Sequence, residues 1–397
     1  MQDTVEKIVA LLPSMNFENY WDGFGEEAFA LYDESTVYLF NHPKCRDKSS
    51  IHFPKDDQFY ACTYILFEDV PTAIVDIRYF DFFEDIYSLI AHESFHAHQY
   101  TLGESRFPNE TIGPAYPSDA EHIHLRIQER KALHDAVFEN SNNLQQQLIN
   151  EFITLREKRT RLYAPCVNYE NRIETIEGPA FYVEYQALRD ISNSENALQR
   201  YASMLLDAED SHVHIRKSCY SSGLFLCLLL DQLLPRWQAE FMHSERDLYH
   251  FFKKRHPDYS PVSIAAPDNK ADVDGIIKTI EDQKKKAFQS FTEGSGHKMT
   301  LTGEMKAAGF DPMNIIILGD RALHQKFLKI RIGAMEHFLQ GPVLTVFDKD
   351  FMTIKTVEIF TEKPPHQSEE ALDIEGIGTI QGNIEFADET ASKIALK

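Results

Sequence analysis

The chain contains few cysteines, and their arrangement argues against two kinds of cross-linked domain. The five cysteines among 397 residues are scattered and odd in number, and none forms a Cys-x-x-Cys pair. A disulfide framework and a structural zinc-thiolate site both need paired or clustered cysteines. We therefore expect reduced thiols, in a chain long enough to be stabilised by a large buried core.

Basic residues and long apolar runs are also scarce. Lysine and arginine total 40 against 62 aspartates and glutamates, which gives a formal net charge of -22. A chain this acidic repels phosphate backbones and anionic membrane surfaces, so neither nucleic acid nor a membrane is an expected partner. The most apolar stretch, from Gly223 to Leu230, is far shorter than the roughly 20 residues that span a bilayer.

Several recognisable signals are missing from the chain. The N-terminal sequence lacks a basic region followed by a long apolar core, so no signal peptide is evident and a cytoplasmic location is expected. There is no Gly-x-Ser-x-Gly elbow, Walker loop or Gly-x-Gly-x-x-Gly turn after a strand. The Asp-rich stretch from Asp268 to Asp274 lacks the calcium-loop pattern. Nothing in the sequence indicates an oligomeric state.

The residue patterns predict an α+β chain. Strand-like runs rich in β-branched and aromatic residues predict a small N-terminal sheet within residues 1–79. Helical spacing dominates residues 80–255, and the first helix is expected at about 80–102. A linker and a charged helix follow at 256–296, and 297–397 reads as a smaller β-rich domain. The predicted N-terminal strands are 28–33, 36–40, 59–67 and 72–77.

The strongest chemical signal is the motif His92-Glu93-Ser94-Phe95-His96 within the predicted helix 80–102. Residues four apart on a helix project from the same face, so His92 and His96 can offer imidazole nitrogens to one ion. Zinc prefers such nitrogen ligands in tetrahedral geometry. Glu93 would flank the ion and could take a proton from a water at the open position, as a general base does.

The residues before Glu93 favour that role. Ile86 and Ile90 lie on its side of the predicted helix, so they can partly desolvate the Glu93 carboxylate. Desolvation raises the pKa of a carboxyl group towards the range useful to a general base.

A catalytic zinc ion also needs a third protein ligand, and the candidates are Glu174, Glu177 and Glu184. Gly178, Pro179 and Ala180 follow Glu177, and Tyr182 and Glu184 continue the segment. With the His92 motif, this segment resembles the gluzincin metallopeptidases, in which a Glu-Gly-x-Ala type segment supplies the third ligand. The resemblance covers about residues 25–255. It implies a thermolysin-like catalytic region with Glu177 as the third zinc ligand.

The residues themselves leave the choice of third ligand open. If a helix opens near Glu177, Pro179 occupies its first turn, where the missing N–H costs nothing, and the helix dipole favours the Glu177 anion. Glu174 would then precede the helix, whereas Glu184 would lie on the Glu177 face and could orient a ligand imidazole. About 80 residues separate His96 from Glu177, so helices between about 119 and 162 must be inserted there.

The developing oxyanion of amide hydrolysis needs a hydrogen-bond donor besides the metal. Tyr220 is the leading candidate, with His214 and Arg216 as alternatives, because the resemblance implies a donor on a helix after the third ligand and small residues follow Tyr220. His98 points to another helix face and is expected to be structural or on the surface. His122, His124 and His134 are not expected to be ligands, although His122 or His124 could line the cleft.

We therefore expect a zinc-dependent hydrolase, with Zn²⁺ held by His92, His96 and Glu177 and with Glu93 and Tyr220 as catalytic groups. A metallopeptidase acting on peptides leads. A zinc hydrolase or lyase acting on a small non-peptide molecule is the first alternative, because the insertion could restrict access to the site. A non-catalytic zinc-containing protein whose C-terminal domain binds a partner is the second alternative.

Overall fold

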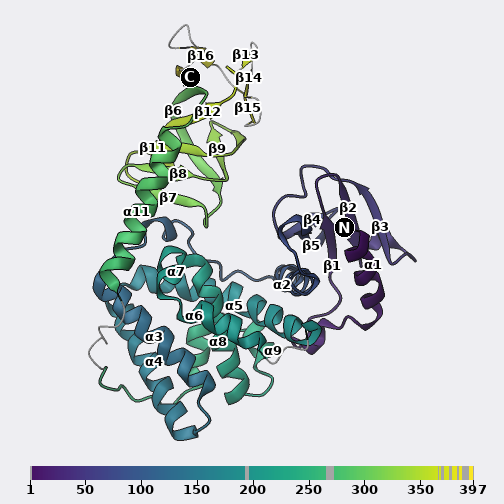
Figure 1. Cartoon of the computed structure of the whole chain (residues 1–397), viewed down its shortest axis with the longest axis vertical. Helices are drawn as coiled ribbons and strands as arrows, with labels where there is room; N and C mark the ends of the chain where they lie inside the picture. Colours follow the sequence, from purple (N-terminus) through teal and green to yellow (C-terminus); the bar gives the residue numbers. More distant parts are fainter. Residues whose placement is uncertain are drawn as a thin grey trace. The chain divides into compact units, whose positions relative to one another are not determined.

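The structure is a computed structural model that describes residues 2–192, 196–264 and 272–364, with short segments beyond them. The chain is a mixture of helix and sheet, 51% helical and 22% strand, with a small N-terminal sheet and a C-terminal sheet (Figure 1). It divides into two compact units. The first unit comprises 1–109, 121–211 and 215–271, and the second comprises 110–120, 212–214 and 272–397. The short segments are 366–367, 371–374, 378–381, 384–386 and 393–396.

The N-terminal sheet has the strand order β3-β2-β1-β5-β4. Strands β1 and β5 run parallel, and the other neighbouring pairs are antiparallel. Strand β3 was not predicted because its sequence, Ser-Ile-His-Phe-Pro, lacks an apolar run and its side chains are half-buried or exposed. The strands are β1 (Ala28–Tyr32), β2 (Thr36–Phe40), β3 (Ser50–Pro54), β4 (Thr63–Phe67) and β5 (Val70–Asp76).

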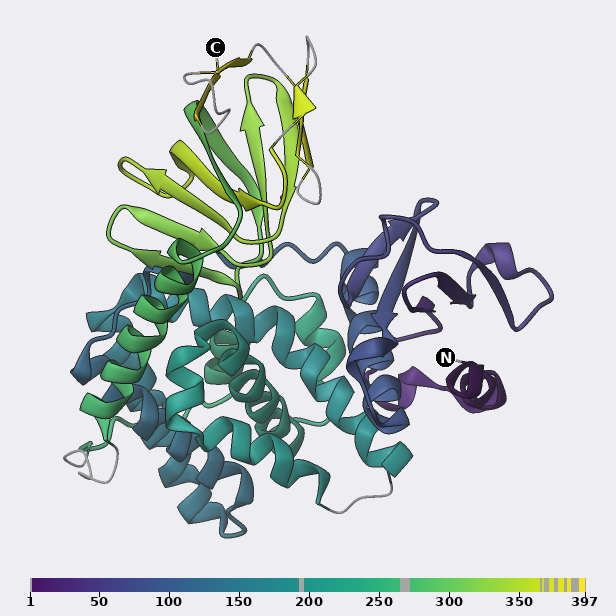
Figure 2. The same cartoon turned by 45° about the horizontal axis from the view of Figure 1, so that its top comes forward.

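Helix α2 (Phe83–Thr101) forms the boundary between this sheet and the helical part of the first unit. It contacts β5 and β4 on one side and α5 (Ala164–Ser192) on the other (Figures 1 and 2). Ile90 and Phe95 are fully buried, and the Phe95 ring lies 4.9 Å from the Trp21 ring. Apolar packing therefore fixes the orientation of this helix, including the face that carries His92 and His96.

The remaining helices of the first unit are built around α5 and α8 (Ile215–Leu233), which pack closely against each other. Helices α3 and α4 occupy the segment between His96 and Glu177 in which helices were expected. The other α-helices of this unit are α1 (Gln2–Leu11), α3 (Ala120–Phe138), α4 (Asn142–Leu162), α6 (Ala197–Leu206), α9 (Trp237–Met242) and α10 (Leu248–Lys254). Helix α7 (Ala208–Val213) belongs to this unit as far as Ser211. Within the described residues, no helix is both long and apolar enough to cross a membrane.

Helix α5 corrects one expectation. It begins at Ala164 rather than near Glu177, so Glu177 lies in the middle of the helix and Pro179 lies inside it. A proline there removes one backbone hydrogen bond and disfavours the helical conformation of the preceding residue. That preceding residue is Gly178, whose missing Cβ relieves the clash, and burial of most of the helix outweighs the lost bond. The helix-dipole argument for Glu177 was therefore wrong.

Two glycines set the distance between α5 and α8. A Cβ added to Gly178 would lie 2.7 Å from the Cα of Gly223, and a Cβ added to Gly223 would lie 2.6 Å from the Cα of Gly178. Real Cβ atoms do not come so close to a backbone, so any larger residue at either position would push the helices apart. This close crossing brings Glu177, next to Gly178, towards Tyr220, one turn before Gly223.

Beside this crossing, α3, α4, α5 and α8 enclose a network of buried charges. Arg156 bonds Glu129 at 2.8 Å and Glu174 at 2.8 and 2.9 Å, and Arg159 bonds Glu129 at 2.8 Å and also Glu170. Every charged group of the network is at most 3% exposed, so each depends on its partners for solvation. The members are Arg126, Glu129, Arg130, Arg156, Arg159, Glu170 and Glu174.

In the second unit α11 is followed by strands that pair mostly antiparallel, and β17 pairs parallel with β6. The main sheet has the order β10-β9-β6-β12-β11-β8-β7, and its core includes Met299, Leu301 and Val357. Part of the predicted linker, 265–270, lies outside the described residues. The elements are α11 (Val273–Thr292), β6 (His297–Phe310), β7 (Ile315–Leu318), β8 (Arg321–His324), β9 (Phe327–Ile332), β10 (Met335–Gln340), β11 (Val343–Phe347), β12 (Thr353–Thr361), β13 (His366–Gln367), β14 (Ala371–Ile374), β15 (Gly378–Gln381), β16 (Ile384–Phe386) and β17 (Lys393–Leu396).

The buried network predicts a loss of stability in acid. Burial raises the pKa of Glu170, but Arg159 and Arg126 outweigh it and hold that pKa well below its usual value; Arg156 and Arg159 likewise lower the pKa of Glu129. A lowered folded-state pKa stabilises the fold above the unfolded pKa, about 4.3, and this stability is lost as pH falls through the folded value. We expect the urea midpoint of the first unit, followed by circular dichroism, to fall steeply below about pH 4.5.

The matched variants for this prediction are Glu170→Gln and Glu245→Gln. At pH 7, Glu170→Gln should cost about 3–5 kcal/mol, because it leaves buried arginines without their partner. It should also flatten the dependence of stability on pH. Glu245 is exposed, so Glu245→Gln should change stability by less than about 0.5 kcal/mol. Equal effects of the two substitutions would contradict a stabilising role for the network.

Candidate metal centre

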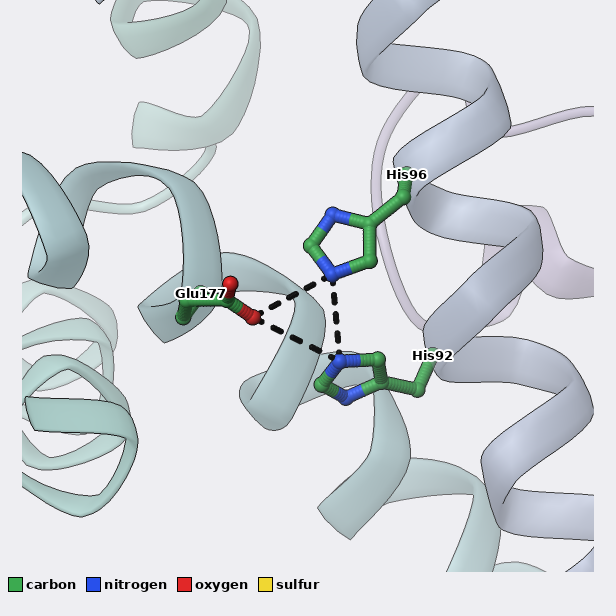
Figure 3. Close-up of side chains that lie close together, drawn as sticks. All are labelled: His92, His96 and Glu177. Carbon is green, nitrogen blue, oxygen red and sulfur yellow. Dashed lines mark hydrogen bonds and ion pairs between the residues drawn. The ribbon is translucent and has the colours of Figure 1, made fainter. Parts of the chain in front are cut away.

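Two helices bring two imidazoles and one carboxylate together (Figure 3). Nε2 of His92 and Nε2 of His96 lie 3.1 Å apart, and Oε2 of Glu177 lies 3.2 Å from the His96 nitrogen and 3.7 Å from the His92 nitrogen. Tetrahedral ligands at about 2.0–2.1 Å from one zinc ion are separated by about 3.3 Å. The three atoms therefore have the spacing of three corners of such a tetrahedron, and the residues fit a zinc ion.

The second nitrogen of each imidazole also has a partner, which orients the ring. Nδ1 of His92 lies 2.9 Å from Oε2 of Glu184, and the Tyr201 hydroxyl donates to the other Glu184 oxygen at 3.1 Å. Nδ1 of His96 lies 2.8 Å from Oε1 of Gln99. Because both neighbouring oxygens are acceptors, they favour the tautomer with the proton on Nδ1, which leaves each Nε2 lone pair for a cation when one is bound.

Gln99 was not singled out from the sequence, and it links the two halves of the site. Its Oε1 faces His96, and its Nε2 donates at 2.8 Å to the backbone carbonyl of Ile176, the residue before Glu177. Because the Nε2 group of Gln99 is bonded to α5, the Oε1 atom of the same carboxamide faces the His96 imidazole. Gln99 lies three residues after His96, so the two side chains share one helix face, and this spacing is the sequence signal that could have identified it.

The electrostatics of the cluster favour an ionised carboxylate next to positive charge. Burial raises the pKa of Glu177, but His96, His92 and Arg216 outweigh it and hold the pKa well below its usual range. Burial lowers the pKa of His92, but the neighbouring Glu177 and Glu184 carboxylates outweigh it and raise the pKa to about 10. Carboxylates that stabilise a positive charge on an imidazole also stabilise a divalent cation at the same place.

Glu93 is buried next to the ligand residues on α2, with 8% of its surface exposed. Burial raises the pKa of Glu93, and the neighbouring His92 and His96 oppose that rise. Desolvation was the effect expected from Ile86 and Ile90, which are both buried. The Glu93 carboxylate is therefore a stronger base than an exposed glutamate would be.

Tyr220 and Arg216 complete the surroundings from α8. The Tyr220 ring stacks on the His92 ring at 6.2 Å, and Nη1 of Arg216 donates to the Tyr220 hydroxyl at 2.6 Å. Nη2 of Arg216 lies 3.1 Å from Oε1 of Glu177, the carboxylate oxygen that does not face both imidazoles. Arg216 thus contacts Glu177 through Oε1 and leaves Oε2 for a cation. The same guanidinium group fixes the Tyr220 hydroxyl beside the Glu177 carboxylate. His214, the other candidate donor, belongs to the second compact unit.

The other candidates have partners of their own. Glu174 bonds Arg156 and Ser222 in the buried network, and Glu184 contacts His92 through Nδ1 rather than through the nitrogen that faces the other ligands. His98 is buried, and its Nδ1 lies 3.3 Å from Glu27. The His122 ring stacks on Tyr163 at 4.2 Å. Of the three glutamates considered, Glu177 is the one that forms a cluster with both motif histidines.

No protein-family model matches the chain, and no curated protein or solved structure matches it either. The argument for its chemistry therefore depends on the geometry of the site.

Gln99 gives a test of this candidate metal centre. Gln99→Leu keeps the side-chain volume but removes the acceptor for His96 and the link to Ile176. The metal affinity is expected to fall about 10- to 100-fold, as it does when other ligand-orienting partners are removed. Competition between the protein and a chromogenic zinc chelator measures it.

Gln128→Leu, on α3, is the matched control and should keep the original affinity. If Gln99→Leu bound zinc as tightly as the original chain, the proposed orienting role of Gln99 would be wrong. Glu177→Gln should lose more affinity than Gln99→Leu, because it removes a ligand charge.

Proposed function

We propose that the chain is a zinc-dependent hydrolase of the gluzincin type, most simply a metallopeptidase. The observation that carries this proposal is the spacing of His92 Nε2, His96 Nε2 and Glu177 Oε2. Three protein ligands leave one tetrahedral position open, which is typical of catalytic rather than structural zinc. A buried carboxylate, Glu93, next to the ligands provides the base that a purely structural site does not need.

The reaction uses the zinc ion and two side chains in distinct roles. When bound, zinc supplies Lewis acidity, which makes a water molecule more acidic and polarises the substrate carbonyl. Glu93 accepts the proton of the attacking water and returns it to the leaving amine. The Tyr220 hydroxyl, held by Arg216, donates a hydrogen bond to the developing oxyanion.

Strand β4 supports a peptide as the substrate. Within the described residues β4 pairs with β5 alone, so its outer edge has free backbone N–H and C=O groups that an extended peptide can bind. The strand contacts α2, and the Tyr64 ring lies 5.6 Å from the ring of Tyr100, one turn after His96. The order of sheet, His92 helix and Glu177 helix is also the order expected for a thermolysin-like region.

One observation favours a small non-peptide substrate instead. The side chains of His92, His96 and Glu177 are only 5%, 13% and 7% exposed, so access to the ligand atoms is restricted. A site whose ligand side chains are this buried admits a small molecule more easily than a folded protein segment. The two candidate functions use the same ion, base and oxyanion donor, and they differ in the substrate that binds at the site.

Glu93→Gln separates an enzyme from a zinc-containing binding protein. The variant keeps the shape of the side chain and all three ligands but removes the base, so turnover is expected to fall about 10²- to 10⁴-fold while zinc content is unchanged. Cleavage of a mixture of quenched fluorescent peptides, with zinc measured by mass spectrometry, tests both.

His98→Asn, two residues beyond the motif on the same helix, is the control and should retain both zinc and turnover. Full turnover in Glu93→Gln would exclude the proposed mechanism. Absence of turnover in the original chain with every peptide would favour the non-peptide alternative.

Tyr220→Phe tests the oxyanion donor. Removing one such donor typically lowers kcat about 10²- to 10³-fold, and KM and zinc content should change little because the ring still stacks on His92. Tyr182→Phe is the matched control. Tyr182 is also a buried tyrosine, but its hydroxyl donates to Asp231 at 2.6 Å. An unchanged kcat in Tyr220→Phe would mean that Tyr220 is a packing residue.

A further inference from the structure

The second unit contains a pocket that the metal centre does not involve. It has a volume of about 680 Å³, within the range of about 300–1,000 Å³ that is usual for ligand sites. Its wall on one side is the last half of α11, and on the other side it is formed by β8, β12 and the loops beside them. All of its lining residues belong to the second unit: Gln283, Lys286, Ala287, Ser290, Phe291, Gly294, Asn314, Leu323, Gln325, Lys326, Pro342 and Phe360.

The floor of the pocket is apolar. Phe291 and Leu323 belong to a buried cluster between α11 and the sheet, and Phe360 packs against that cluster. The Phe291 and Phe360 rings lie 5.3 Å apart, edge to face. An apolar group that entered the pocket would therefore displace water from aromatic and aliphatic surface, which is favourable.

The charge of the pocket is opposite to that of the chain. The chain carries 62 acidic residues, yet no carboxylate lines this pocket and two lysines do. In the part of the chain that the structure describes, neither the Lys286 nor the Lys326 ammonium group forms an ion pair or hydrogen bond. Other lysines of the unit do, such as Lys285 with Glu281 and Lys298 with Glu358. The two pocket ammonium groups are thus available to an anion.

Neutral polar groups complete the lining. The carboxamides of Gln283 and Gln325 also have no hydrogen-bond partner among the described residues, and the Ser290 hydroxyl is at the same wall. A hydrocarbon chain with a carboxylate would use the floor and the lysines but would leave these groups unmatched. A peptide end offers all three: an apolar side chain, a terminal carboxylate, and backbone amides for the carboxamides.

We propose that this pocket binds the C-terminal end of a peptide whose last residue is apolar. The apolar side chain lies on Phe291, Leu323 and Phe360, and the terminal carboxylate lies between Lys286 and Lys326. Gln283 and Gln325 bond the last backbone amide groups. The inference depends on the second unit alone, so it does not require the metal centre to be catalytic.

The test uses a dansyl-Gly-Gly-Leu-Phe probe with a free C-terminal carboxylate, and its C-terminal amide as the matched ligand. Fluorescence anisotropy is measured with the full chain carrying Glu93→Gln, so that the probe is not consumed. The amide is expected to bind about tenfold more weakly, because it loses two partly exposed ion pairs. Decanoate, added as a competitor, should displace the probe only at much higher concentration than the unlabelled peptide.

Three variants locate the binding. Lys286→Glu with Lys326→Glu should weaken binding of the free acid at least about tenfold, because attraction becomes repulsion. Ala287→Trp fills the pocket and should abolish binding of both the acid and the amide. Lys285→Glu changes the same charge on the same helix, but Lys285 does not line the pocket, so affinity should stay within about twofold.

Several results would overturn the proposal. Equal affinity for acid and amide would remove the role of the carboxylate, and undiminished binding to Ala287→Trp would place the probe elsewhere. Displacement by decanoate at lower concentration than by the peptide would assign the pocket to an aliphatic carboxylate instead. Since Glu93→Gln and Tyr220→Phe report on the metal centre through turnover, failure of either inference leaves the other result interpretable.

Discussion

The site depends on one contact between helices, that of α2 with α5. Neither helix holds a metal-binding cluster alone, because α2 supplies two imidazoles and α5 supplies the carboxylate. The contact is held at the site itself by Gln99, which bonds an imidazole of one helix and a backbone carbonyl of the other. A shift of about 1 Å between the helices would take the three ligand atoms out of range of one ion.

The position of α5 depends in turn on its neighbours. The Gly178–Gly223 crossing lets the backbones of α5 and α8 touch, which brings Tyr220 and Arg216 to the candidate ligands. The buried charge network acts on the same helix: Glu170 and Glu174 lie on α5, and their partners lie on α3 and α4. Buried ion pairs seldom add much net stability, but a network in which each charge needs its own partner allows few alternative packings. We infer that α3 and α4 serve to position α5.

The features that were predicted correctly depend on residues that are close together in the sequence. The His92 motif and its helix follow from spacing along one element, and the expected range 80–102 is close to the observed Phe83–Thr101. The seven-residue spacing from Glu177 to Glu184 predicted an orienting role, and Glu184 does contact His92. Strand β3 was not predicted, because it forms by pairing with β2 and has no apolar pattern of its own.

The predicted start of α5 was wrong because tertiary packing, and not the local sequence, determines where this helix begins. Gly-Pro is a strong local stop signal, and tertiary packing overrides it here, so Glu177 sits in mid-helix. Gln99 and Arg216 act across elements, between α2 and α5 and between α8 and α5. Such partners depend on the packing of helices that are distant in sequence, and no spacing within one helix specifies them fully.

The strong negative charge constrains both proposed sites in different ways. Four arginines and three glutamates are buried in the network, so the remaining groups carry a net charge slightly more negative than -22. The resulting field repels acidic peptides at long range, but at physiological salt it is screened beyond about 8 Å. A peptide approaching the metal centre is therefore favoured if it is basic. A terminal carboxylate can still bind between Lys286 and Lys326, because within a few ångströms the two local ammonium groups outweigh the screened field of the distant carboxylates.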